Sequence, residues 1–154
     1  MFFGEKGKHT KIRDLVKASK ERALPVIHEN APLQEIIDAM IRSGHSRLLY
    51  VVDEEEKLLG TISLGMLLKQ VFTRSHDPQI HPRRLMDAIT FETAEHMMQK
   101  HPVFAREDED LHVIIRRMIR SNVKEMAVLD HEGKVVGDMT ILDVLKLLSQ
   151  NAKR

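Results

Sequence analysis

The chain contains an internal repeat, and this feature restricts its possible folds more than any other. The segment Ile36–Ser43 recurs as Ile114–Ser121 at an offset of 78 residues, with six of the eight positions identical. Upstream, Pro25-Val26 matches Pro102-Val103 at an offset of 77, which places one extra residue in the loop before the second helix. The sequence therefore predicts a tandem duplication of a unit of roughly 60 residues.

Both copies predict the same order of secondary structure. In the first copy, apolar periodicity and turn residues predict strands at 25–28, 48–52 and 58–63, and helices from Leu33 to Ser43-Gly44 and at 64–72. In the second copy they predict strands at 102–105, 126–129 and 135–139, and helices at 111–121 and 141–148. The order β-α-β-β-α therefore occurs twice, in a chain of the α/β (α+β) class.

The predicted organisation is one copy over residues 11–73, a linker over 74–93 and a second copy over 94–150. The linker contains two prolines and has no apolar period, which is typical of a connection rather than an element. Neither copy can cover the apolar face of its own sheet. We therefore expect the two copies to pack into one globule with pseudo-twofold symmetry.

Composition excludes several classes of function. The 24 Lys and Arg residues nearly balance 23 Asp and Glu residues, which argues against a nucleic-acid binder. The absence of cysteine excludes disulfides and cysteine-ligated metals and fits a reducing compartment. With no apolar run of about 20 residues and no secretory signal, the sequence predicts a cytoplasmic protein without a membrane span. The nine histidines lack metal-binding spacing, and hydrolase and ATPase motifs are missing, so neither a metal site nor enzymatic activity is expected.

Three motifs within this repeated frame are similar to those of a known family. Glu95-His-Met-Met98…Pro102-Val is similar to "D-I-M…P-V", Lys124–Asp130 lies where "R-x-L-P-V-V-D" often occurs, and Gly137-Asp-Met-Thr140-Ile-Leu-Asp143 matches "G-h-x-[S/T]-x-x-D". From about Lys11 to Ser149, the chain resembles a pair of cystathionine-β-synthase (CBS) domains, or Bateman module. The resemblance implies a regulatory pair, without catalysis, that binds AMP, ADP, ATP, S-adenosylmethionine or a related adenosine ligand between its sheets.

The residues of the third motif suit this ligand. A helix start offers unpaired N–H groups and a partial positive charge to a phosphate, and the Thr140 hydroxyl can donate another hydrogen bond. The two carboxylate oxygens of Asp143 can accept the two hydroxyls of a ribose, and Gly137 would let the backbone approach the ligand. The same spacing also fits a capping box, with Thr140 as N-cap and Asp143 bonding back to its N–H. The two roles are compatible.

The first copy departs from this motif. Gly60-Thr-Ile-Ser63-Leu-Gly-Met66 keeps the glycine and the hydroxyl, but methionine stands where the second copy has Asp143. Ser63 can still cap its helix or contact a phosphate. We therefore expect one adenosine site, built on the second copy.

Further site residues follow from the resemblance. Adenine contacts are expected near the first and second strands of the second copy, at Met98, His101, Val103, Val123 and Lys124. Each of them also suits an ordinary position in the core or at a strand edge. Lys124 and its counterpart Arg47 are the cations best placed for phosphate, with a solvated surface as the alternative for both.

The sequence therefore predicts a stand-alone regulatory module that binds an adenosine ligand non-covalently and signals its occupancy to an unknown partner. A homodimer is expected by resemblance. The alternative is an interaction scaffold whose ligand clefts stay empty and whose exposed helices mediate assembly. Met66 favours the scaffold, whereas the intact pair of Thr140 and Asp143 favours ligand sensing.

Overall fold

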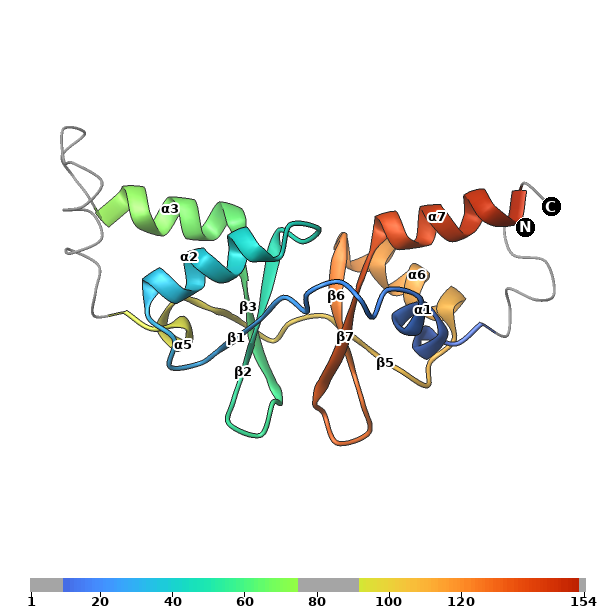
Figure 1. Cartoon of the computed structure of the whole chain (residues 1–154), viewed down its shortest axis with the longest axis horizontal. Coiled ribbons are helices and arrows are strands. Elements are labelled where there is room, and N and C mark those ends of the chain that lie inside the picture. The colour runs from blue at the N-terminus through green and yellow to red at the C-terminus, as the bar shows by residue number, and fades with distance from the viewer. Residues whose placement is uncertain (1–9, 75–91, 153–154) are drawn as a thin grey trace. The chain divides into compact units, whose positions relative to one another are not determined.

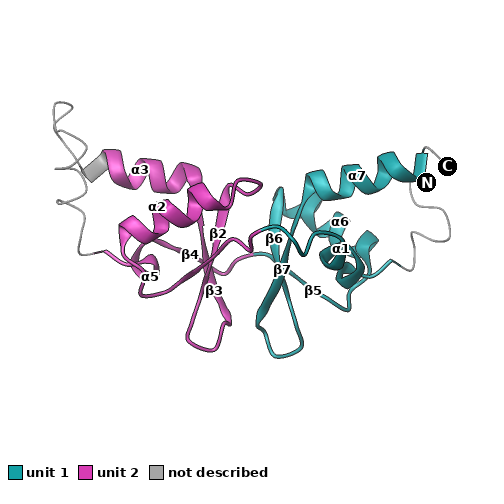
Figure 2. Cartoon of the chain, viewed as in Figure 1, with its two compact units in different colours: residues 1–22, 103–154 teal, residues 23–102 magenta. Residues whose placement is uncertain are grey.

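The computed structural model describes residues 10–74 and 92–152, and the chain forms two compact units (Figures 1 and 2). Unit 1 consists of residues 1–22 and 103–154, and unit 2 consists of residues 23–102. Most of the predicted linker, 74–93, lies outside the described residues.

Unit 2 contains a four-stranded sheet with the order β1-β2-β3-β4. The strands β1 and β2 are parallel, and the pairs β2–β3 and β3–β4 are antiparallel. Its elements, in chain order, are β1 (Val26–His28), α2 (Leu33–Arg42), β2 (Leu48–Val52), β3 (Leu58–Ser63), α3 (Leu64–Arg74), α5 (Ala94–Met97) and β4 (Gln99–Lys100).

Unit 1 contains a three-stranded sheet with the order β5-β6-β7, in which β5 and β6 are parallel and β6 and β7 antiparallel. Its elements are α1 (Ile12–Ala18), β5 (Phe104–Arg106), α6 (Leu111–Ser121), β6 (Glu125–Leu129), β7 (Val135–Thr140) and α7 (Ile141–Ala152). The predicted order β-α-β-β-α is confirmed in both units. The elements α1, α5 and β4 were not predicted.

The duplication extends to the strand register. Leu48 pairs with Ser63 in β2–β3, and Glu125 pairs with Thr140 in β6–β7, so both partners are displaced by 77 residues. Each of these hairpins also carries one register shift, at the same place. The two hairpins are therefore copies of one another down to this irregularity.

The first strand corrects the predicted repeat alignment. Val26 of β1 pairs with Tyr50, whereas Phe104 of β5 pairs with Ala127, the residue equivalent to Tyr50. Val26 therefore corresponds to Phe104, at an offset of 78, and not to Val103. The extra residue of the second copy lies before its first strand rather than before its helix.

Each unit has a hydrophobic core of its own. Periodic apolar residues put one face of α2 and of α6 against the sheets, because side chains at i, i+3 and i+7 share a helix face. The buried residues on these faces are Leu33, Ile36, Ala39 and Met40 in α2, and Leu111, Ile114 and Met118 in α6. The chain therefore has two hydrophobic cores, one in each unit.

The first segment of each predicted copy packs in the unit that the other copy mainly forms. Ile12, near the start of the first copy, is fully buried in the core of unit 1, and its N–H donates to the carbonyl oxygen of Glu109 at 3.0 Å. Ala94, at the start of the second copy, is fully buried in unit 2, and its N–H donates to the carbonyl oxygen of Ala31 at 3.0 Å. The helices α1 and α5 are thus equivalent, and each completes the core of the other copy.

Candidate functional site

The residues of the predicted ligand motif lie where β7 leads directly into α7. Asp143 accepts a hydrogen bond on Oδ2 from the backbone N–H of Thr140 at 2.9 Å. The backbone N–H of Asp143 donates to Oγ1 of Thr140 at 3.2 Å. These reciprocal bonds form the predicted capping box, which satisfies two backbone donors at the start of the helix.

A third residue completes this arrangement, and it is Arg22, from the segment after α1. Its Nη1 and Nη2 each lie 2.8 Å from one carboxylate oxygen of Asp143, which makes the ion pair bidentate. Its Nε and Nη2 lie 3.3 and 3.2 Å from Oδ1 of Asp138, and Nη2 also donates to the backbone carbonyl of Asp138 at 3.0 Å. One guanidinium therefore binds two carboxylates and a strand edge.

This cluster of Arg22, Asp138 and Asp143 is largely withdrawn from solvent. The side chains are 20%, 4% and 10% exposed, respectively. Burial of Asp143 opposes its ionisation, but the hydrogen bonds from Arg22 and Thr140 and the charge of Arg22 outweigh it and hold the pKa of Asp143 below its ordinary value. The carboxylate is therefore ionised at neutral pH, in the state that accepts hydrogen bonds from a ligand or from Arg22.

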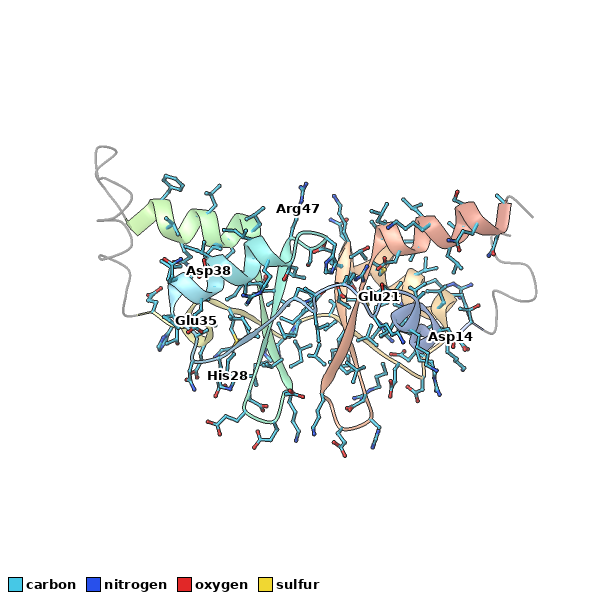
Figure 3. All side chains as sticks on the ribbon, viewed as in Figure 1. Asp14, Glu21, His28, Glu35, Asp38 and Arg47 are labelled. Atoms are coloured by element: carbon cyan, nitrogen blue, oxygen red, sulfur yellow. The ribbon has the colours of Figure 1, made fainter. Side chains whose placement is uncertain are left out.

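Packing of α1 on β7 brings Arg22 to this place. Gly137 of β7 lacks a side chain, and a methyl group there would lie 2.5 Å from Cγ1 of Val16 on α1. The absent side chain thus makes room for α1, a different use of the glycine from the backbone approach to a ligand that the sequence predicted. With α1 seated on Gly137, the chain leaves the helix close to Asp138 and Asp143 (the neighbouring Glu21 is labelled in Figure 3).

In unit 2, the strand β3 is the counterpart of β7, and its edge is paired with another strand instead of a side chain. Gly60 and Thr61 of β3 pair with Lys100 and Gln99 of β4. Thr61 is the counterpart of Asp138 at the offset of 77. Among the described elements of unit 1, no strand pairs with the outer edge of β7, and Nη2 of Arg22 binds the carbonyl of Asp138 there. Arg22 therefore takes the place of a fourth strand at this point.

The first copy has only half of the helix cap. The hydroxyl of Ser63 accepts a hydrogen bond from the backbone N–H of Met66 at 3.0 Å. Met66 has no oxygen with which to bond back, so the reciprocal bond seen between Thr140 and Asp143 has no equivalent. The structure thus shows in unit 2 the same departure that the sequence indicates.

The two predicted phosphate cations lie next to the starts of the helices. The backbone carbonyl of Lys124 accepts the N–H of Ile141 at 2.8 Å, and that of Arg47 accepts the N–H of Leu64 at 2.9 Å. Both side chains are exposed, and Figure 3 labels Arg47. Lys124 is therefore close in the chain fold to Thr140 within unit 1, and Arg47 is close to Ser63 within unit 2.

The other predicted contacts divide between the units. Val103 and Val123 pack against the core of unit 1. Met98 packs against the core of unit 2, and His101 is exposed with a left-handed backbone conformation at φ 60°. Within unit 1 the structure therefore brings together Gly137, Thr140, Asp143 and Lys124, and within unit 2 it places Arg47, Ser63, Met98 and His101.

Sequence reasoning missed Arg22 and Asp138. Arg22 carries no local signal, because its partners lie 116 and 121 residues away in the chain. Asp138 did carry one: it is a charged residue inside a strand, at the position where the motif "G-h-x-[S/T]-x-x-D" has a hydrophobic residue. A carboxylate at such a position needs a partner in the fold.

No helix within residues 10–74 and 92–152 is both long and apolar enough to cross a bilayer. In the same residues, no group of three or more His, Cys, Asp and Glu side chains has an arrangement that could hold a metal ion.

Comparison with known proteins gives a match over most of the chain. The family model described as "CBS domain" matches residues 12–72 and 94–150. A curated relative, the magnesium transporter MgtE of Thermus thermophilus, is 26% identical over 130 residues, which cover 82% of this chain and 25% of the relative. The chain thus spans about a quarter of the length of that protein.

Several solved structures share the fold. A CBS domain-containing protein from Thermotoga maritima is 29% identical with a TM-score of 0.67, and the match covers 92% of this chain and 96% of the other. The CBS domain pair of protein MJ0100, in complex with 5'-methylthioadenosine and S-adenosyl-L-methionine, is 22% identical with a TM-score of 0.69 and coverages of 92% and 98%. CBSX2 in complex with AMP is 18% identical with a TM-score of 0.69 and coverages of 94% and 98%.

Proposed function

Since this chain belongs to the CBS domain family, we propose that its CBS domain pair binds an adenosine-containing ligand at the β7–α7 junction and signals its occupancy to a partner protein. The observation that carries the proposal is the placement of Thr140 and Asp143 at the start of a twelve-residue helix, α7. The complexes of related folds with AMP and with S-adenosyl-L-methionine support the ligand class. The role is regulatory rather than catalytic.

Each group at the junction has a defined task in this proposal. The N–H groups of the first turn of α7 and the hydroxyl of Thr140 donate to a phosphate oxygen. The ionised carboxylate of Asp143 accepts the two ribose hydroxyls, a charge-assisted arrangement that is stronger than neutral hydrogen bonds. Lys124, which is exposed beside Ile141, adds a positive charge for the phosphates. Val103 and Val123 supply apolar surface for the purine.

A second candidate function is the scaffold, in which the junction only stabilises the fold. The capping box and the ion pair with Arg22 favour it, because they satisfy Thr140 and Asp143 without a ligand. Ligand titration separates the two functions.

We expect adenosine ligands to raise the melting temperature of the protein. At a ligand concentration about 100-fold above Kd, the free energy of unfolding should increase by about 2.7 kcal/mol. Differential scanning fluorimetry with AMP, ADP, ATP, NAD and S-adenosylmethionine measures this. If none of them shifts the melting temperature at millimolar concentration, ligand sensing is contradicted and the scaffold function is left.

The matched variants Asp143→Ala and Met66→Ala test which copy binds. Loss of the carboxylate should weaken binding by about 1.5–3 kcal/mol, the usual value for hydrogen bonds to a charged group, whereas Met66→Ala should leave Kd unchanged. Isothermal titration calorimetry gives both values. Two equal sites that are both insensitive to Asp143→Ala would contradict the assignment to the second copy.

We also propose that the chain forms a homodimer through α3 and α7. Exposed apolar residues recur at equivalent positions of the two helices: Leu64 and Leu68 in α3 are 44% and 57% exposed, and Ile141 and Leu145 in α7 are 47% and 53% exposed. Exposed apolar groups on adjacent helical turns are typical of surfaces that associate. A second copy of the chain presents the same surface, as a twofold interface requires.

The double variant Leu68→Glu/Leu145→Glu should therefore weaken the dimer at least tenfold, because buried charges oppose association. Sedimentation velocity over a concentration series measures the effect. The pair Lys69→Gln/Lys146→Gln, at neighbouring exposed positions, changes the net charge by the same amount and is the control for charge alone. A wild-type chain that stays monomeric at every concentration would contradict the proposed dimer.

A further inference from the structure

The junction already contains a group that binds Asp143 as a ribose would. A ribose presents two neighbouring O–H donors to the two oxygens of a carboxylate. Arg22 presents two N–H donors to the same two oxygens, each at 2.8 Å. Oδ2 also accepts the N–H of Thr140, and only 10% of the Asp143 side chain is exposed. A ribose and the guanidinium therefore compete for one acceptor.

Arg22 can leave Asp143 without unfolding the unit. It lies beyond the C-terminal end of α1, in a turn outside the helices and strands. Its backbone N–H makes a single 3.3 Å bond to the carbonyl of Ser19. Movement of the side chain breaks no hydrogen bond within a helix or between two strands. The guanidinium that moves away still carries its charge and needs a new acceptor.

We propose that Arg22 is a specificity-determining residue of this site: it competes with the ligand for Asp143, so that the site selects phosphorylated adenosine ligands over neutral nucleosides. A phosphate group offers the displaced guanidinium a bidentate acceptor that replaces the carboxylate. Adenosine displaces the guanidinium from Asp143 but has no phosphate that could accept its hydrogen bonds. This inference rests on the proposed adenosine binding and adds to it the basis of the choice among ligands.

The test compares AMP with adenosine in the wild-type protein and in Arg22→Gln. Glutamine cannot form the charged bidentate pair, so adenosine should bind at least about tenfold more tightly to the variant, the equivalent of removing one charge-assisted competitor. AMP should improve less, because it loses its partner for the phosphate. The Kd of adenosine divided by the Kd of AMP, both measured by calorimetry, should therefore fall, and the fall reaches about tenfold if AMP gains nothing.

Two controls protect this comparison against a loss of stability. Arg22→Lys keeps the charge but cannot hold both oxygens of Asp143, so its ratio should lie between those of the wild type and of Arg22→Gln. It replaces Arg22→Gln in the test if that variant does not fold. Arg117→Gln removes another bidentate arginine of unit 1, which binds Glu109 at 3.0 and 2.7 Å, and it should leave the ratio unchanged. The melting temperature without ligand identifies variants that are folded.

A second measurement uses the wild-type protein alone. In protein labelled with 15N-arginine, the guanidinium signals of Arg22, assigned by their loss in Arg22→Lys, should shift when AMP is added, whereas those of Arg117 should not. Binding of AMP with an unchanged ratio in Arg22→Gln, or with unshifted Arg22 signals, overturns the role of Arg22 and leaves the proposed function standing. Absence of binding by every adenosine compound in wild type and variants overturns both.

Discussion

Replacing Arg22 by methionine should lower the free energy of unfolding by about 3 kcal/mol. Methionine keeps part of the stem but takes the Arg22 guanidinium away from a buried carboxylate, Asp138, and a partly buried one, Asp143. Removing one partner of a buried ion pair costs roughly 3–5 kcal/mol, and the lower value applies because a fifth of the Arg22 side chain is exposed. Urea denaturation at neutral pH, followed by circular dichroism, measures the difference.

The matched control is Arg117→Met. Arg117 also forms a bidentate pair in unit 1, but its side chain and that of Glu109 are 33% and 24% exposed, so solvent compensates more of the loss. We expect an effect of about 1 kcal/mol there. Equal losses in the two variants would contradict the view that burial around Asp138 makes the Arg22 ion pairs more stabilising than that of Arg117.

The difference in the free energy of unfolding between wild type and Arg22→Met should depend on pH. The pKa of Asp143 is lower in the folded chain than in the unfolded chain, because hydrogen bonds from Arg22 and Thr140 and the charge of Arg22 outweigh the effect of burial. Its stabilising contribution is therefore present above the unfolded pKa of about 3.9 and is lost as the pH falls through the folded pKa. The difference between wild type and Arg22→Met should be constant near neutrality and should shrink in acid, because Asp143 is protonated at a higher pH in the variant, where burial is no longer offset by Arg22.

The second large effect is expected for Gly60→Ala, at about 3 kcal/mol. A methyl group at this position would lie 2.6 Å from the carbonyl oxygen of Gln99 and 2.7 Å from Sδ of Met98. The methionine can move, but the carbonyl belongs to β4, which pairs with β3 at Gly60 and Thr61. The substitution therefore separates two strands, and the upper end of the range of about 1–3 kcal/mol for overpacking applies.

The equivalent Gly137→Ala provides the comparison. Here the methyl group would meet side-chain atoms of Val16, with Cγ1 at 2.5 Å and Cγ2 at 2.9 Å. We expect a loss of about 1–2 kcal/mol, and the second substitution Val16→Ala should restore part of it because it vacates the same space. Thermal denaturation of the single and double variants measures the coupling. If Gly60→Ala melted like the wild type, close contact between β3 and β4 would be disproved.

Local patterns predicted the repeated elements well because each signal lies within a few residues. The apolar spacing in Leu33, Ile36 and Met40 predicted α2, and the continuous apolar run at 48–52 predicted β2 with its observed bounds. The capping box at Thr140 and Asp143 was also readable, since it needs only residues three positions apart. For these features the sequence carries the physical cause directly.

Contacts across long stretches of chain were not predictable in the same way. The four-residue helix α5 and the two-residue strand β4 are too short to show a period. The helix α1 has apolar residues that could face either copy, and only the fold assigns Ile12 to the core of unit 1. Arg22 is one of 24 basic residues, and nothing in its neighbours indicates that it binds Asp143.

The repeat alignment failed for a related reason. Proline followed by valine occurs at the start of β1 and just before β5, and this identity suggested that Val26 and Val103 are equivalent. Pairing with the second strands shows that Val26 corresponds to Phe104. Strand register depends on backbone hydrogen bonds to the partner strand. The equivalent residues Val26 and Phe104 share only a preference for strands, so their side chains do not reveal the register.

The exchange of α1 and α5 between the copies determines what a shortened chain would lose. Removal of the first 22 residues would delete Ile12 from the core of unit 1, uncover Gly137 on β7 and free Asp143 of its arginine, although all of the second copy would still be present. The span 23–102, in contrast, is a continuous stretch that holds every described strand of its own sheet. A proteolytic cut just before Ala23 would therefore separate Arg22 from the rest of the chain's first copy and act on unit 1, where it would expose the carboxylate of Asp143, while unit 2 stayed whole.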